Sequence, residues 1–204
     1  MSLKPSLFGV VALTLVALLS AGCSDNGSGQ VLYVDAEFDP PTTADTFTGV
    51  NEASPAVAQT FTVLATGRFE EFWIVINDGP SADSGIVRLT VRPVNAMGEP
   101  DPDESTSIIR AIDVDTSTLP GTLVEEFSEF FVGDDPRRNV QAGEVYAIVV
   151  EFISRTTSND TLEIATLLGQ AGDPYADGSG ATGQSGVGFT LNNNDYFFRT
   201  FSLR

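Results

Sequence analysis

The sequence predicts an all-β protein, an antiparallel β-sandwich of jelly-roll-like type with about nine strands. Turn-forming Gly, Pro, Asn and Asp recur about every eight to twelve residues, and the short runs between them are rich in Val, Ile, Thr and Phe. Several of these runs alternate between apolar and polar positions, as strands with one buried face do. No stretch beyond the amino-terminal segment keeps a helical period over three turns.

The expected strands follow the apolar runs in chain order. They are Val31–Asp35, Gln59–Leu64, Phe69–Asn77, Ile86–Val94, Ser107–Val114, Val124–Val132, Glu144–Ile153, Thr161–Leu167 and Tyr196–Leu203. The expected loops are Asn77–Gly85, Ala96–Thr106, Asp115–Thr122, Gly133–Gly143 and Gly169–Gly188. The almost wholly apolar run Tyr146–Val150 predicts a central strand that is covered on both faces.

Alternation assigns side chains to faces in three of these strands. Phe72, Ile74 and Ile76 oppose Trp73, Val75 and Asn77; Val87, Leu89 and Val91 oppose Arg88, Thr90 and Arg92; Phe198, Thr200 and Ser202 oppose Phe197, Arg199 and Phe201. The run Val124–Val132 alternates less cleanly. There, Phe131 and Glu129 take a buried and a wet face only if the strand is bulged or twisted between them.

Residues 1–22 predict a signal helix. Lys4 supplies a positive start, and Leu7 to Leu19 form an apolar run too short for a spanning helix, which needs about 20 such residues. The segment ends in Leu19-Ser20-Ala21-Gly22-Cys23, which resembles the lipobox of bacterial lipoproteins. The alternative is an ordinary secretory signal followed by a chance cysteine.

The lipoprotein resemblance implies cleavage before Cys23 and acyl chains on that cysteine, so that lipid holds the chain to a membrane. It places the protein in the bacterial cell envelope on the extracytoplasmic side, at the outer membrane if the cell is Gram-negative. Residues 23–29 are small and polar and predict a flexible tether, and 30–204 are expected to form a single β-sandwich domain. With one cysteine in the chain, no intramolecular disulfide can form.

The charge is strongly acidic. All 28 acidic residues follow the predicted cleavage site, and nine arginines remain once Lys4 is removed, so the mature net charge is −19. Such a surface repels nucleic acid, and no nucleic-acid partner is expected. The acidity favours solubility, or alternatively cation binding.

A second resemblance covers residues 57–203. Its motifs are Gln59-Thr60-Phe61-Thr62-Val63, Leu119-Pro120-Gly121-Thr122, Ala142–Val150, Asp173-Pro174-Tyr175 with Gly178, and Asp195–Phe201. In this order they resemble the β-jelly-roll accessory modules of bacterial extracellular proteins. The resemblance implies a sandwich fold and an extracytoplasmic location, but no activity.

We expect no enzymatic activity. The chain has no histidine, which excludes histidine-based triads, and its one cysteine is assigned to lipid. Carboxylate-based glycoside hydrolysis is the weaker alternative. The adjacent pairs Glu70-Glu71, Glu125-Glu126 and Asp134-Asp135 have the wrong geometry for a shared site, because strand neighbours point to opposite faces.

No cofactor is required, and a structural Ca²⁺ is the one metal that the sequence favours. Its expected ligands are Asp173, Asp177 and Asp195, because loop oxygens suit calcium. Asp101–Glu104 and Asn192–Asp195 are further acid-rich segments. The alternative is that Asp and Asn here serve only as turn residues.

The expected function is a non-catalytic binding or adhesion module for a glycan or an envelope protein. Sugar binding needs aromatic platforms, for which Trp73, Tyr175 and Tyr196 are the candidates, although Trp73 also suits a covered surface. Arg199, beside aromatics in the last strand, suits a satisfied ion pair better than a ligand contact. The alternative function is a structural envelope or assembly component without a small ligand.

Overall fold

A computed structural model of the protein describes residues 31–39, 43–80, 84–121, 124–156 and 162–204. The strands are β1 (Leu32–Phe38), β2 (Thr46–Val50), β3 (Ala56–Thr62), β4 (Gly67–Ile74), β5 (Ile76–Asp78), β6 (Gly85–Pro93), β7 (Ile112–Asp115), β8 (Ser128–Phe131), β9 (Asn139–Val140), β10 (Val145–Arg155), β11 (Ala165–Ala171), β12 (Gly180–Gln184), β13 (Gly188–Leu191), β14 (Asn194–Tyr196) and β15 (Phe198–Leu203). The antiparallel sandwich predicted from the sequence is confirmed. The signal peptide, Cys23 and the tether lie outside the described residues.

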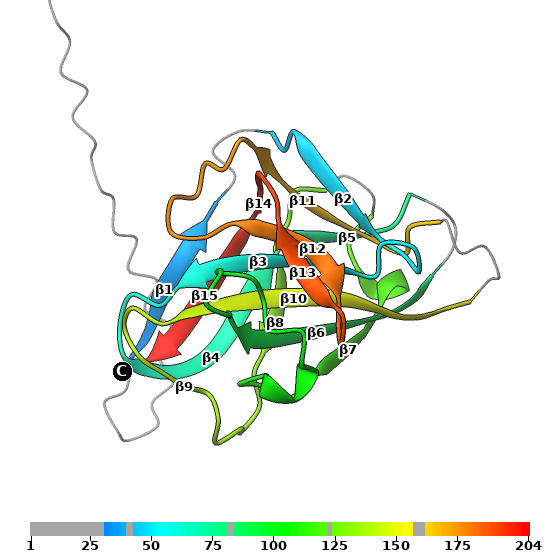
Figure 1. Ribbon diagram of the computed structural model, residues 1–204. Coiled ribbons are helices and arrows are strands. Elements are labelled where there is room, and N and C mark those ends of the chain that lie inside the picture. Colours follow the sequence, from blue (N-terminus) through cyan, green and yellow to red (C-terminus); the bar gives the residue numbers. More distant parts are fainter. Residues whose placement is uncertain (1–30, 40–42, 81–83, 122–123, 157–161) are drawn as a thin grey trace, which may run out of the picture.

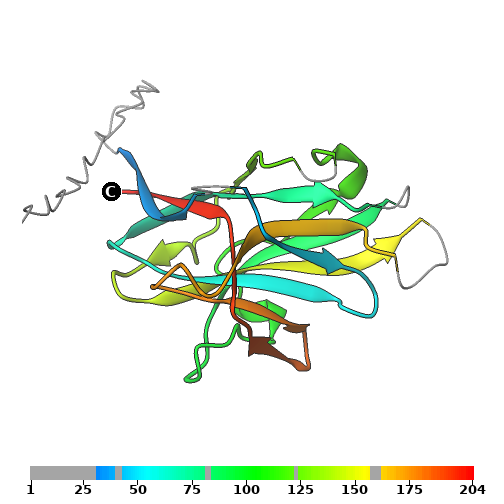
Figure 2. The same ribbon diagram turned by 90° about the horizontal axis from the view of Figure 1, so that it is seen from above.

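Two large sheets face each other (Figures 1 and 2). One has the order β1-β15-β4-β8, with β9 also pairing β4, and the other has the order β13-β12-β3-β10-β6-β7. Consecutive strands such as β3 and β4 lie in different sheets. The main core lies between the sheets and includes Phe61, Phe72, Ile148 and Phe198, all fully buried.

The alternation read from the sequence places the core side chains. Val87, Leu89 and Val91 are fully buried in the main core, as are Phe72, Ile74 and Ile76. β10 is the central strand that was expected: Ile148 and Val150 face the main core, while Ala147 and Val149 join a second cluster on the opposite face. β8 pairs with β4 without a bulge, so Glu129 and Phe131 share the exposed face and Phe130 takes the buried position.

A third, smaller sheet, β14-β11-β2, joins the first sheet at a corner. β4 and β15 are paired as far as Ile74 and Phe198. Beyond this point the chain continues from β4 into β5 and precedes β15 as β14, and β5 and β14 pair with separate parts of β11. The backbones of Val75, Leu168 and Phe197 exchange hydrogen bonds at this point. Their side chains form a small buried cluster with Ala44, so apolar packing holds the corner.

The β12–β13 hairpin is the main element that sequence reasoning missed, because it falls at the end of the expected loop Gly169–Gly188. β12 pairs antiparallel with β3, so the hairpin extends the edge of the six-stranded sheet (Figure 1). Phe189 of β13 packs on Ala147 and Val149, and small side chains permit this close approach. A Cβ on Gly180 would lie 2.1 Å from the carbonyl oxygen of Asn194, so this position requires glycine.

Short strands also appear where loops or nothing were expected, namely β2 and the two-residue β9. The expected strand Ser107–Val114 is ordered as a strand only at Ile112–Asp115, and Val124–Val132 only at Ser128–Phe131. The helices in the described part of the chain are the three-residue 3-10 turns Glu104–Thr106 and Thr116–Thr118. No helix among the described residues has the length and apolarity to cross a bilayer.

Candidate functional site

The outward side of the sheet β1-β15-β4-β8 presents three cross-strand rows of side chains. The first row is Leu32, Leu203 and Arg68; the second is Val34, Phe201, Glu71 and Phe131; the third is Glu37, Arg199, Trp73 and Glu129. These residues point outward because the alternate positions, such as Phe72, Phe198 and Thr200, are buried inside. We call the second and third rows, together with Phe127, the outer face.

Trp73 occupies the middle of the outer face and is half-buried there. Its ring lies 4.7 Å from that of Phe201 and 6.1 Å from that of Phe127, measured between centroids. Its indole N–H donates a hydrogen bond to Glu71. Neighbouring rings and the Arg199 guanidinium therefore fix Trp73 in place, as the covered-surface interpretation expected.

Arg199 forms an ion pair within the fold, as the sequence suggested. Its Nε donates to Asp39 Oδ1 at 2.6 Å, and Glu37 lies 3.5 Å away. The guanidinium stacks over Phe127 at 5.0 Å and Trp73 at 5.5 Å from the ring centroids. The hydrogen bond to Asp39 raises the pKa of Arg199, so its charge is permanent and already neutralised.

Glu71 is the unusual charge of the outer face, because only 6% of its surface is exposed. Burial raises the pKa of its carboxyl, the hydrogen bond from Trp73 lowers it in part, and the nearby charge of Glu129 raises it further. Phe131, beside Glu71 on the next strand, is 70% exposed. The second row therefore combines exposed apolar side chains with a buried acid.

The three predicted calcium ligands are not gathered into a cation site. Asp195 is fully buried and both its oxygens accept hydrogen bonds, Oδ1 from Gln59 Nε2 at 3.0 Å and Oδ2 from Tyr175 N at 2.8 Å. Burial raises the pKa of Asp195. Asp173 and Asp177 lie exposed in the loop before β12, and Asp173 accepts a hydrogen bond from Ser179. Within the described ranges, no three Asp, Glu or Cys side chains are placed to hold a metal ion.

The other aromatic candidates serve the core. Tyr196 is fully buried, and its hydroxyl is hydrogen-bonded to Thr48 Oγ1 at 2.9 Å, so its ring has no face toward solvent. Tyr175 is half-buried and packs edge-on against Phe198 at 5.2 Å, and burial raises its pKa to about 12. Trp73, Tyr175 and Tyr196 thus do not share one open surface, and Trp73 alone belongs to the outer face.

The acidic pairs and segments are engaged separately. Glu70 binds Arg68 and Arg138, whereas its neighbour Glu71 binds Trp73. Asp101 and Asp103 accept hydrogen bonds from backbone N–H groups two residues ahead, which is the turn chemistry weighed against calcium. Asp134 and Asp135 pair with different arginines. Among the described residues, the carboxylates of Glu70-Glu71 and of Asp134-Asp135 are therefore directed to different partners.

A hollow of about 310 Å³ lies beside the first row and is lined by Arg68, Asn139 and the loop 134–138. Arg138 at its wall is almost fully buried and donates to Glu70, Asp134 and the carbonyl oxygens of Val132 and Gly133. The guanidinium donors of Arg138 are therefore used within the fold, where they hold the loop 132–138 against β4.

Sequence reasoning identified Trp73 and Arg199 but did not identify Glu71, Phe131 and Phe201 as their neighbours on the outer face. The alternation of the last strand already placed Phe201 beside Arg199, but the register that brings β8 and β15 to β4 joins distant segments. The chain matches no model of a known protein family, and no curated protein matches it either.

Proposed function

We propose that this chain is a bacterial lipoprotein, anchored by lipid on Cys23 on the extracytoplasmic side of the envelope, whose sandwich is a non-catalytic binding module. Its ligand is an envelope protein that docks on the outer face. The observation that carries this proposal is the second row, in which the apolar side chains of Val34 and Phe131 are exposed on either side of Phe201 and Glu71.

A protein fits this surface better than a glycan. Sugar recognition needs a ring with a free face, but the ring of Trp73 is flanked by Phe201, Phe127 and Arg199. Protein interfaces instead have an apolar centre with aromatic and Arg side chains and a polar rim. The second row supplies the apolar centre, and Glu37, Arg199 and Glu129 of the third row supply the rim.

The charge of the outer face indicates the character of the partner. Arg199 is neutralised by Asp39 and Glu37, which leaves Glu71 and Glu129 as acids without a basic partner among the ion pairs of the described residues. The mature chain as a whole carries −19. We therefore expect a partner with an apolar centre and a basic rim, attracted by long-range electrostatics at low salt.

The anchor is tested by replacing Cys23 with Ser. The variant should leave the envelope pellet and incorporate no radioactive palmitate, because acylation requires the thiol. A variant that still pellets with envelopes and still carries palmitate would refute the anchoring.

Docking is tested with a photo-cross-linking amino acid in place of Phe131, compared with the same group in place of Val187. Both positions are well exposed, at 70% and 77%, but Val187 lies in the β12–β13 turn, away from the outer face. A protein adduct at position 131 that is lost on Glu129→Arg and is absent at position 187 supports the proposal. Adducts of equal yield at both positions, or a glycan retained by the outer face, would contradict it, and self-adducts would indicate an assembly subunit.

A further inference from the structure

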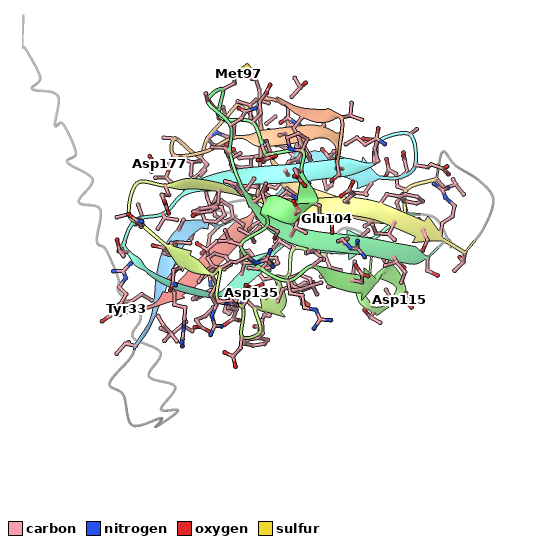
Figure 3. All side chains as sticks on the ribbon, turned by 60° about the horizontal axis from the view of Figure 1, so that its bottom comes forward. Tyr33, Met97, Glu104, Asp115, Asp135 and Asp177 are labelled. Carbon is pink, nitrogen blue, oxygen red and sulfur yellow. The ribbon has the colours of Figure 1, made fainter. Side chains whose placement is uncertain are left out.

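Exposed apolar side chains gather at one end of the sandwich. Val31, Leu32, Tyr33 and Leu64 are 51%, 45%, 44% and 63% exposed. We call these four residues the apolar pole. Figure 3 shows Tyr33 at one end of the molecule and Asp115 near the other. A soluble domain seldom leaves adjacent large apolar groups in water without a partner for them.

The structure holds the apolar pole in one piece. Leu64 N and Ala65 N both donate to Asp35 Oδ1 at 3.1 Å, which fastens the β3–β4 loop against β1. Leu32 pairs with Leu203 in the last strand, so the start of the domain is paired into the first sheet. The apolar side chains are therefore presented by rigid elements.

Two arginines lie among the side chains at this end. Asp35 is fully buried and also contacts Arg204 at 3.5 Å, and the Arg204 guanidinium stacks over Tyr33 at 4.9 Å. Arg68, next to Leu203 in the first row, is partly exposed. Glu144, which is partly exposed and hydrogen-bonded through its backbone to Val63, accepts hydrogen bonds from the Tyr146 hydroxyl and the backbone N–H of Gln141. Two arginines beside apolar side chains suit the boundary between headgroups and acyl chains.

The length of the preceding chain brings this end close to the predicted anchor. Seven residues lie between Cys23 and Val31, and the eight residue-to-residue steps span at most about 28 Å at full extension. A tether this short raises the effective concentration of the surface at the bilayer, so a contact too weak for a free domain becomes populated. The anchored domain thus has a bilayer within reach of its apolar pole.

Resting on the proposed anchoring, we propose that the apolar pole docks on the lipid bilayer, with Leu32, Tyr33 and Leu64 among the headgroups. The strands then stand away from the surface. Row three of the first sheet is four residues farther along β15 than row one, about 13 Å at the usual rise per residue. Bilayer contact therefore leaves Trp73 and Arg199 clear for a partner.

The test uses the full lipidated chain in phosphatidylcholine vesicles that contain brominated acyl chains, which quench nearby indoles. In a Trp73→Phe background, Leu64→Trp reports from the apolar pole and Val187→Trp from the distant hairpin turn. Both substituted positions are exposed, so both variants should keep the fold, which thermal melting checks. We expect at least a twofold loss of fluorescence for Leu64→Trp and no change for Val187→Trp.

The outcomes separate the two proposals. A chain that does not float with the vesicles overturns the anchoring, and the docking with it. A chain that floats but shows no quenching at position 64, or equal quenching at positions 64 and 187, overturns the docking and leaves the anchoring standing.

Discussion

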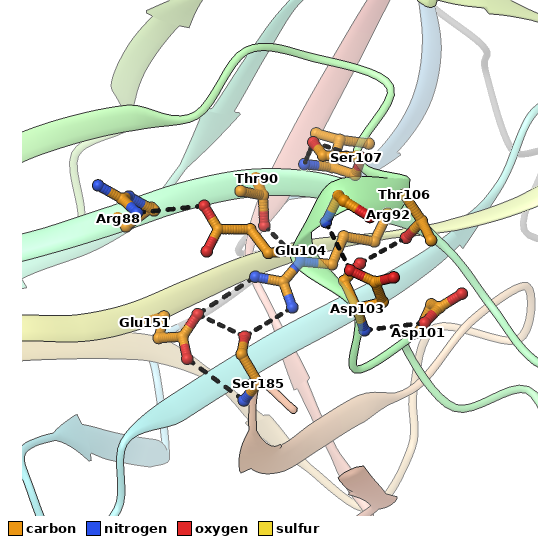
Figure 4. A network of polar contacts seen from close by, with 12 residues as sticks. Arg88, Thr90, Arg92, Asp101, Asp103, Glu104, Thr106, Ser107, Glu151 and Ser185 are labelled. Atoms are coloured by element: carbon orange, nitrogen blue, oxygen red, sulfur yellow. Dashed lines mark hydrogen bonds and ion pairs between the residues drawn. The ribbon is translucent and has the colours of Figure 1, made fainter. Parts of the chain in front are cut away.

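Replacing Glu151 with Ala should destabilise the sandwich more than any single change to a surface charge. Glu151 faces Arg92, which is fully buried on the outward side of the six-stranded sheet (Figure 4). Alternation predicted that Arg92 points away from the core, and it does. It is buried because the β12–β13 turn lies over it, held by Ser185.

The structure sets the magnitude. Arg92 Nη2 lies 3.2 Å from Glu151 Oε2, while its Nη1 donates to Ser185 Oγ at 2.7 Å and its Nε to Thr90 at 2.8 Å. Glu151 also accepts the backbone N–H of Ser185 at 3.2 Å. Removing the carboxylate leaves a guanidinium charge without its counter-ion at zero exposure, which costs about 3 to 5 kcal/mol. For a domain of this size that is a fall in Tm of roughly 6 to 20 °C.

Urea unfolding followed by Trp73 fluorescence measures the loss. Arg137→Ala is the matched control, because the Arg137–Asp135 pair has the same type of contact but the Arg137 side chain is half exposed, so its loss should cost far less than that of Glu151. The double variant Arg92→Met/Glu151→Ala should recover most of the loss, since it removes the buried charge as well. A loss below 1 kcal/mol for Glu151→Ala, or a double variant that equals the sum of the two single ones, would refute the reasoning.

Three further predictions follow from particular contacts. Because the folded-state pKa of Glu71 is raised, the parent protein loses stability as pH rises from the usual glutamate range through that higher pKa. In melting curves across pH, the stability of Glu71→Gln should equal that of the parent below about pH 4 and exceed it at pH 7, by about 1.4 kcal/mol for each pH unit by which the pKa is raised. Gly180→Ala should cost about 1 to 3 kcal/mol in urea unfolding because its Cβ meets the Asn194 carbonyl oxygen, while Gly133→Ala, with no atom within 4 Å, should cost nothing measurable. Calcium or a chelator should leave Tm unchanged because both oxygens of Asp195 are occupied; a rise with calcium would restore the predicted site.

The sequence was sufficient for the fold class and for the faces of the strongly alternating strands, because burial of one face is encoded locally. It was insufficient for β12, whose Gly180, Ala181 and Gly183 are poor strand formers that the close approach of other segments requires. It also failed to decide between Phe130 and Phe131, since two adjacent aromatics fit either phase of the alternation.

The candidate site was predictable only in part, for the same reason. Trp73 and Arg199 are conspicuous as residue types, but the sequence does not contain the register that pairs Trp73 with Glu129 and Phe201 with Glu71. Asp195 and Tyr196 were interpreted as ligand-binding residues because the sequence does not show that tertiary contacts bury them. Gln59, which is 136 residues from Asp195 and 137 from Tyr196, makes hydrogen bonds to both.

The pairing of β1 with β15 has a consequence for the order in which the protein can be completed. Ala36 in β1 donates its backbone N–H to the hydroxyl of Thr200, which is synthesised 164 residues later, and β4 also pairs with β15. Until residues 198–203 emerge, the sheet lacks its middle member and β1 has no place to add. Under the export that we propose, with the amino end crossing first, this sheet would stay open until residues 198–203 have also crossed.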